Sequence, residues 1–161
     1  MILKGEGFEI RPLTACKLDA AVQVYRQSGG GQVSGQTVLE DMTSSSQSGG
    51  AFCGIYDLQD ELVGVIDFVP ANYTGKAEDA CIRALKIAAP FRGRGYGSKA
   101  ITRLVEELRK NGQIRRVWAC FVGGCPTRQD FALRLGFHPP DETTGQHPEG
   151  SDGVILVKDL V

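Results

Sequence analysis

The stretch Leu85-Lys86-Ile87-Ala88-Ala89-Pro90-Phe91-Arg92-Gly93-Arg94-Gly95-Tyr96-Gly97-Ser98 decides the fold of this chain. It begins as an apolar strand, continues as a glycine-rich turn, and ends at the start of an amphipathic helix. Gly93, Gly95 and Gly97 let the backbone adopt unusual angles and approach a ligand closely. The unpaired N–H groups and the positive dipole end of a helix N-terminus favour a phosphate. The stretch therefore predicts a loop that holds a pyrophosphate through its main chain.

Two of three common phosphate-loop patterns do not fit this loop. A P-loop requires Gly-Lys followed by Ser or Thr, whereas the order here is Gly97-Ser98-Lys99-Ala100. The dinucleotide pattern requires G-x-G-x-x-G, whereas the glycines here stand at alternate positions. The third pattern is Gln or Arg, two residues, Gly, one residue, then Gly or Ala, and residues 92–97 fit it completely. That pattern resembles the coenzyme A loop of the GNAT superfamily, the acyl-CoA-dependent N-acyltransferases.

The composition of the 161-residue chain is ordinary for a soluble globular protein and predicts one domain over residues 1–161. There is no apolar run of the length that a transmembrane helix needs, so we expect no membrane association. The N-terminus lacks the layout of a signal peptide, which favours a cytoplasmic location. A formal net charge of −1, with no wider basic patch around the loop, argues against nucleic-acid binding.

The cysteines are odd in number and lie mostly in apolar segments, which is typical of reduced intracellular thiols rather than of a disulfide framework. They are Cys16, Cys53, Cys81, Cys120 and Cys125. No Cys-x-x-Cys pair occurs, and the only histidines are His138 and His147, so we expect no metal site.

Hydrophobic periodicity predicts elements in the order β-α-α-β-β-β-α-β-α-β-β. Strands are expected over residues 8–13, 51–56, 62–69, 80–88, 116–122 and 152–158, and helices after Thr14, over 37–44 and 98–109, and from Thr127. A hairpin-rich first half followed by β-α-β-α is typical of a mixed α/β or α+β layout around one central sheet.

The resemblance to the GNAT superfamily extends from about Phe8 to Leu160. Residues 61–66 look like the family's third strand, Leu135-Gly136-Phe137 looks like its Leu-Gly-Phe ending, and residues 153–160 look like its last strand. The resemblance implies a mixed, mostly antiparallel central sheet flanked by helices.

The resemblance also implies acetyl-CoA, or another acyl-CoA, as the co-substrate. In the family the pantetheine arm enters a gap between two splayed strands and pairs with the main chain of one of them, here near Leu85 and Ile87. The loop residues Gly93, Gly95, Tyr96 and Gly97 would hold the pyrophosphate, with Tyr96 expected to pack. Side chains that could add phosphate contacts are Arg92, Arg94 and Ser98. Lys99 and Arg103 are expected to form a solvated helix face.

The catalytic side chains of the family are not kept. The position of its tyrosine acid holds Ala132, and the position of its usual asparagine holds Cys125. The places where relatives often carry a Glu or His hold Cys81, Arg83 and Cys120. A thiol is a poor general base, so buried inert cysteines are the simpler interpretation. The general acid therefore has no candidate.

Two carboxylates are candidate bases that could take the proton from an ammonium acceptor. Asp67 stands between Ile66 and Phe68 in an apolar strand, where it is either buried with a raised pKa or at a strand end in water. Asp79 follows Glu78 just before the strand that resembles the family's fourth, near the expected entrance of the acceptor. The alternative interpretation is that Asp79 is an ordinary residue of a solvated loop.

These observations favour direct transfer of an acetyl group to a primary amine of a small molecule or protein by a monomer or homodimer. Acidic loop residues would suit a cationic acceptor, although loops are usually polar. They are Asp41, Glu78, Asp79, Asp141, Glu142, Glu149 and Asp152. The alternative is a non-catalytic acyl-CoA-binding or regulatory module, which Ala132 and Cys125 at functional positions would explain.

Overall fold

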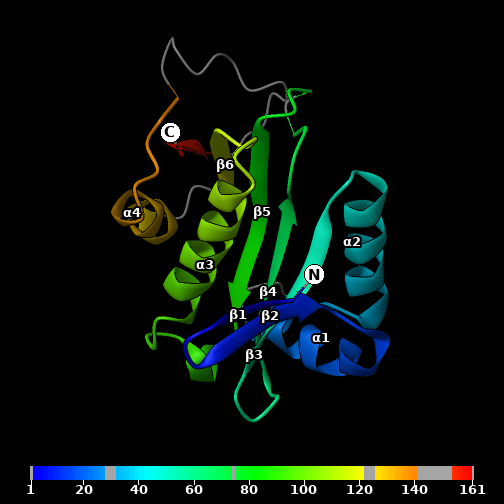
Figure 1. The fold of residues 1–161 in the computed structure, drawn as a ribbon. Helices are drawn as coiled ribbons and strands as arrows, with labels where there is room; N and C mark the ends of the chain where they lie inside the picture. Colours follow the sequence, from blue (N-terminus) through cyan, green and yellow to red (C-terminus); the bar gives the residue numbers. More distant parts are fainter. Residues whose placement is uncertain (1, 28–31, 74, 122–125, 141–153, 161) are drawn as a thin grey trace.

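The computed structural model describes residues 2–27, 32–73, 75–121, 126–140 and 154–160 (Figure 1). Seven strands form one sheet whose spatial order follows the chain from β1 to β7. Neighbouring strands are antiparallel except β5 and β6, which are parallel. The strands are β1 (Leu3–Gly5), β2 (Phe8–Pro12), β3 (Ala51–Asp57), β4 (Leu62–Val69), β5 (Asp79–Ile87), β6 (Arg116–Phe121) and β7 (Val154–Asp159). The expected mixed, mostly antiparallel sheet is confirmed.

Helices cover both faces of this sheet (Figure 1). On one face lie α1 (Leu18–Gln27) and α2 (Gly35–Gln47), and on the other α3 (Tyr96–Lys110) and α4 (Pro126–Arg134). Short 3₁₀ turns occur at Ala15–Lys17 and Ala89–Phe91. The parallel pair β5 and β6 requires a crossover connection, and α3 provides it. Within the described ranges, no helix is both long enough and apolar enough to span a membrane.

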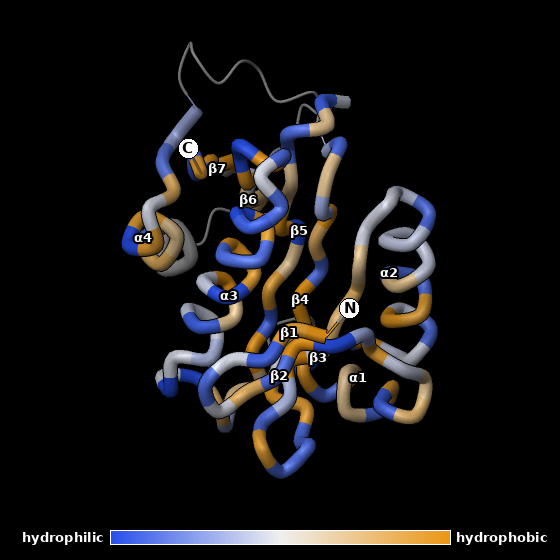
Figure 2. The backbone as a smooth tube through the Cα atoms, viewed as in Figure 1, coloured by the Kyte–Doolittle hydropathy of each residue, from blue (hydrophilic) through white to orange (hydrophobic). Residues whose placement is uncertain are grey.

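Each face of the sheet has its own apolar core, and the strands between them are predominantly hydrophobic (Figure 2). Beneath α3, the buried Ile101 and Leu104 belong to one cluster with Ile66 of β4. On the other face Val22 of α1 and Val38 of α2 belong to a second cluster. Burial of these helix stripes at about 25 cal/mol per Å² of apolar surface supplies the main driving force for folding.

Three elements differ from the prediction. The strand β1 was not expected, because its three residues are too few to show an alternating pattern; it pairs with β2 through Leu3 opposite Ile10. The helix α2 extends beyond residues 37–44 at both ends, into its serine-rich C-terminal part, where Ser45 is buried. The predicted order ends in two consecutive strands after the last helix. Among the residues described, the first of these two is only a single bridge between His138 and Val157.

Candidate active site

The strands β5 and β6 separate halfway along β5. Their pairing runs from Asp79 opposite Arg116 to Ile82 opposite Ala119, whereas β5 continues to Ile87. Strand β4 pairs with β5 on both sides of an irregularity, since Asp67 stands opposite Ala84 and Phe68 opposite Ile82. Arg83 is therefore an extra residue in β5, and such a bulge bends a strand locally. The second half of β5 thus presents a backbone edge to which β6 is not paired, as expected for Leu85 and Ile87.

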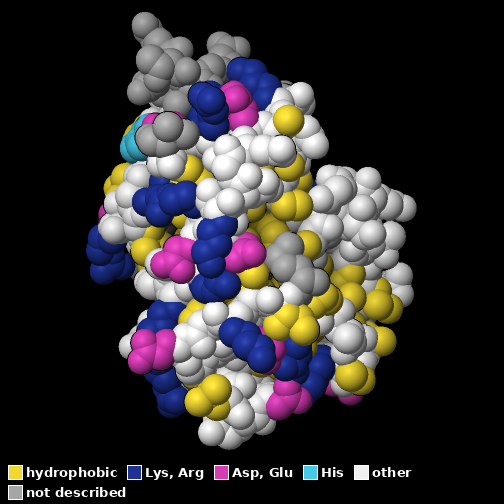
Figure 3. Space-filling view, in the orientation of Figure 1, with side chains coloured by type: hydrophobic (Ala, Val, Ile, Leu, Met, Phe, Trp, Pro, Cys, Tyr) yellow, Lys and Arg dark blue, Asp and Glu magenta, His cyan; other side chains and the backbone are white. Residues whose placement is uncertain are grey.

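A cavity of about 140 Å³, here called the α4 cleft, opens along this edge on the face of α3 and α4. It is lined by β5 residues 82–86, Ala119 and Cys120 of β6, Ile101 of α3, Phe131 and Ala132 of α4, and Phe137. The side chains of Leu85 and Ile87 pack against the core, so a ligand could reach only their main chain, where the Ile87 carbonyl already accepts a hydrogen bond from Arg92. Figure 3 shows hydrophobic side chains reaching the surface between α3 and α2.

A second cavity of about 250 Å³, here called the α2 groove, lies on the opposite face of β5. Tyr25 of α1, three residues of α2, Phe52 and Asp67 line it together with Arg83, Ala84 and Lys86. The three α2 residues are Asp41, Ser44 and Ser45. Because Arg83, Ala84 and Lys86 line both cavities, β5 forms the wall that the two share.

The carboxylate of Asp67 is held by two donors in this groove. Its Oδ1 accepts a hydrogen bond from the Ser45 hydroxyl at 2.6 Å and one from the Arg83 guanidinium at 3.2 Å. The same guanidinium donates to the Ser48 hydroxyl at 2.5 Å, which fastens the end of α2 to the sheet. Asp67 is thus largely buried as an ion pair, with 14% of its side chain exposed.

A second polar pair joins α1 to α2 across the groove. The Tyr25 hydroxyl donates to Asp41 Oδ2 at 2.6 Å, and Lys86 Nζ lies 5.0 Å from the centre of the Tyr25 ring. Burial and the nearby Asp41 carboxylate raise the pKa of Tyr25 well above its ordinary value. The phenol therefore remains a neutral donor at physiological pH.

Two of the three loop glycines have the unusual backbone angles that the sequence predicts. Gly93 and Gly95 have φ angles of +77° and +85°, which side-chain-bearing residues rarely adopt. Gly95 is the N-cap of α3, and the first backbone bond of the helix runs from the Lys99 N–H to the Gly95 carbonyl at 3.0 Å. The N–H groups of the first helical turn are thus left for another acceptor. Gly97 lacks a positive φ, and Tyr96 packs edge-on against Phe91 as expected.

The two loop arginines have different surroundings. Arg92 donates to the Ile87 carbonyl at 3.0 Å and to the Gln27 carbonyl at 2.5 Å, while the Gln27 side chain accepts from the Ala89 N–H. Arg92 therefore joins the end of α1 to the loop. Arg94 is exposed, with its guanidinium 5.5 Å from the centre of the Phe91 ring. The phosphate contacts predicted for these side chains and for Ser98 stay predictions.

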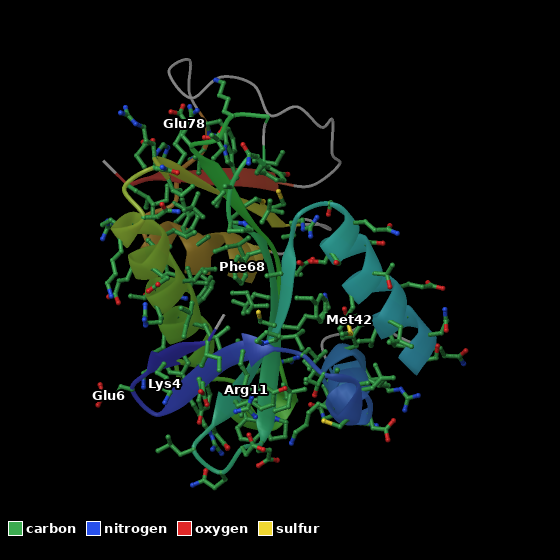
Figure 4. The ribbon with its side chains drawn as sticks, turned by 45° about the vertical axis from the view of Figure 1, so that its right-hand side comes forward. Lys4, Glu6, Arg11, Met42, Phe68 and Glu78 are labelled. Atoms are coloured by element: carbon green, nitrogen blue, oxygen red, sulfur yellow. The ribbon has the colours of Figure 1, made fainter. Side chains whose placement is uncertain are left out.

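Asp79 lies inside a strand rather than in the solvated loop considered as its alternative. It is 1% exposed and accepts a hydrogen bond from Arg116 Nε at 2.8 Å, while Arg116 also pairs with Glu78 at 3.1 Å. In Figure 4, Glu78 lies at one end of the sheet and Arg11 lies at the other end. Asp79 and Arg83 are four positions apart in β5, which is about 13 Å along the strand. Asp79 is not among the described residues that line either cavity.

Sequence reasoning missed Tyr25, Ser45 and Lys86 as groove residues, and placed Asp41 only as a loop acid. An acidic residue inside a helix and a tyrosine on an apolar helix face give no signal that they meet. The expected solvated face of α3 is also partly structural, because Arg103 donates to the Lys4 carbonyl at 2.9 Å.

Several predicted positions fall outside the described residues. They are Cys125 and the acidic residues Asp141, Glu142, Glu149 and Asp152. Groups of three or more possible metal ligands are not found in the part of the chain that is described.

The model of the acetyltransferase (GNAT) family matches residues 18–137. An acetyltransferase from Thermus thermophilus has a TM-score of 0.77 at 22% identity, covering 99% of each chain. A GNAT superfamily phosphinothricin acetyltransferase from Sinorhizobium meliloti, in complex with AcCoA, has a TM-score of 0.70 at 17% identity, covering 96% of this chain and 89% of the other. The PaiA N-acetyltransferase from Thermoplasma acidophilum, in complex with coenzyme A, has a TM-score of 0.68 at 19% identity, covering 96% of this chain and 99% of the other. No curated protein sequence matches the chain.

Proposed function

Because this chain belongs to the GNAT acetyltransferase family, we propose that it transfers an acetyl group directly from acetyl-CoA to a primary amine of a small molecule or protein. The observation that carries the proposal is that two cavities on opposite faces of the sheet share Arg83, Ala84 and Lys86 as their wall. One cavity can hold the acyl donor and the other the amine, so the reacting atoms would meet at β5.

The residues of the α4 cleft and the glycine loop fit coenzyme A. The N–H groups at the start of α3 and the backbone around Gly93 offer donors for a pyrophosphate, and a Cβ built on Gly93 would meet nothing within 4 Å. The unpaired edge of β5 offers amide groups to the pantetheine arm.

The bound thioester would supply the acetyl group and a thiolate leaving group. The chain's own contribution is mainly positioning, which can lower a barrier by about 7–11 kcal/mol in favourable cases. Asp67 is the candidate base that lines the α2 groove, and its Oδ2 would accept the amine proton, directly or through a water. Its Oδ1 is held by Ser45 and Arg83, so Oδ2 is the oxygen proposed to meet the amine.

The acceptor is proposed to enter the α2 groove. The described lining carries the carboxylates Asp41 and Asp67 and the cations Arg83 and Lys86, so its charges are balanced. The cationic acceptor that acidic loop residues suggested therefore gains no support from the groove itself, and zwitterionic amines belong among the candidates.

The non-catalytic alternative remains the second candidate, because Ala132 lines the α4 cleft where the family's tyrosine acid would stand. The test measures coenzyme A thiol release from acetyl-CoA with a panel of polyamines, amino acids and lysine peptides, and identifies the acetylated product by mass. We expect release above the amine-free background for at least one class. Binding of coenzyme A without release for any amine would favour the non-catalytic module, and absence of coenzyme A binding would contradict both.

A further inference from the structure

Two cysteine sulfurs lie in contact across the parallel strands β5 and β6. Cys81 Sγ and Cys120 Sγ are 3.6 Å apart, and both cysteines are reduced. Cys81 stands opposite Trp118, and Cys120 lies two residues further along β6 on the same face of the sheet. The Tyr73 hydroxyl lies 3.4 Å from Cys120 Sγ and packs beside the pair.

The pair spans the point where the two strands separate. The last paired residues are Ile82 and Ala119, so Cys81 comes just before the separation and Cys120 just after it. Cys81 is 1% exposed, whereas Cys120 is half-buried and lines the α4 cleft. A small reagent in the cleft can therefore meet Cys120 first, and Cys81 only through it.

We propose that Cys81 and Cys120 form an oxidation site at which a hydroperoxide converts the two thiols into an interstrand disulfide. The sulfur of Cys120, as thiolate, attacks one peroxide oxygen, which gives a sulfenic acid and releases water or an alcohol. The Cys81 sulfur then bonds to the Cys120 sulfur and displaces hydroxide, which leaves as water with the Cys81 proton. Two thiols lose two hydrogens, and the peroxide is reduced.

The order of these steps follows from burial. Burial raises the pKa of the Cys81 thiol, which keeps Cys81 protonated and unreactive until an electrophilic sulfur is beside it. Forming the bond shortens the sulfur–sulfur distance from 3.6 Å to about 2.05 Å. Because the contraction acts where the strands part, it draws Cys120 toward β5 and reshapes the cleft proposed for the acyl donor.

The first test uses the reduced wild-type protein and hydrogen peroxide. We expect loss of two thiols and of two hydrogen atoms from the mass, with one peptide bridge that links Cys81 to Cys120 and is cleaved by dithiothreitol. Cys16→Ser and Cys53→Ala should keep this bridge, because neither residue belongs to the Cys81–Cys120 contact. Cys16 is exposed, and Cys53 is buried in β3. Cys125→Ser should keep it too, while Cys81→Ala should lose it. A bridge that includes Cys125, or oxidation of Cys120 to a sulfinic acid without a bridge, would overturn the proposal.

The second test concerns the cleft and rests on the proposed function. Retention on immobilised coenzyme A should fall on the order of tenfold after peroxide treatment, a change of about 1.4 kcal/mol, and return with dithiothreitol. Retention of Cys81→Ala should not respond to peroxide. A mapped bridge with unchanged retention would refute the effect on the cleft. If reduced protein is not retained at all, the acyl-CoA function fails, and the thiol result still decides the oxidation site.

Discussion

The Arg83 guanidinium and the Asp67 carboxylate lie 3.2 Å apart on neighbouring strands, at the bulge where β5 leaves β6. Arg83 also donates to Ser45 and Ser48, so one side chain joins α2, β4 and β5. This arrangement ties one residue of the wall shared by the two cavities, Arg83, to an acid that lines only the α2 groove.

The first prediction concerns this ion pair. Arg83→Met should lower the free energy of unfolding by about 1–3 kcal/mol, because a largely buried Asp67 carboxylate loses its cation. Asp67→Asn in the same background should recover part of that loss. Urea unfolding of the two single variants and the double variant measures the coupling. Strictly additive effects would show that the pair does not act as a unit.

A second prediction compares two glycines with the same backbone strain. Gly95→Ala and Gly112→Ala place a side chain at φ angles of +85° and +70°, with no neighbour closer than 3.9 Å in either case. Each should lose about 1–2 kcal/mol of stability. Only Gly95→Ala should weaken retention on immobilised coenzyme A, since Gly95 caps the end of α3 that we propose binds the pyrophosphate. Equal retention of both variants would contradict the loop's proposed role.

The third prediction separates Arg92 from Arg94. Arg92→Ala removes hydrogen bonds to the Ile87 and Gln27 carbonyls and should cost about 1 kcal/mol of stability. Arg94→Ala, at an exposed position, should change stability by less than about 0.5 kcal/mol. Thermal unfolding followed by circular dichroism measures both. Equal melting temperatures for the two variants would argue against Arg92 as a link between α1 and the loop.

The fourth prediction concerns alkaline pH. The pKa of Tyr25 is raised in the folded state, so the folded protein holds this proton more tightly than the unfolded chain does. The resulting stability is complete below the ordinary tyrosine pKa of about 10 and declines as pH rises above it, by at most about 1.4 kcal/mol per pH unit for one proton. Unfolding measured from pH 8 to pH 11 should show a shallower decline for Tyr25→Phe. Parallel declines would mean that Tyr25 does not carry the effect.

The sequence allowed prediction of the parts of the site that depend on local backbone chemistry. Alternating glycines after an apolar strand specify a turn with positive φ angles, and Gly93 and Gly95 have them. The apolar stripe that includes Ile101 and Leu104 specified α3 and its buried face. Both signals lie within a few residues along the chain, where steric rules act directly.

The parts that could not be predicted depend on contacts between distant residues. Asp79 follows another acid and precedes a strand, which is typical of a solvated loop, but its partner Arg116 comes 37 positions later. The α2 groove similarly depends on Tyr25 reaching Asp41 and on Arg83 reaching Ser45, each across separate elements. Arg92 carried a charge that suits phosphate, and only the fold shows the Gln27 carbonyl beside it. The single-domain and cytoplasmic assignments stay predictions.

The shared wall formed by Arg83, Ala84 and Lys86 has a consequence for how this enzyme can diversify. With the acyl donor in one cavity and the amine in the other, as proposed, a replacement there would alter the Michaelis constants of both reactants together, so selection could not tune one without disturbing the other. New acceptor preferences would therefore arise at the groove residues that do not line the opposite cavity, which lie on α1, α2, β3 and β4.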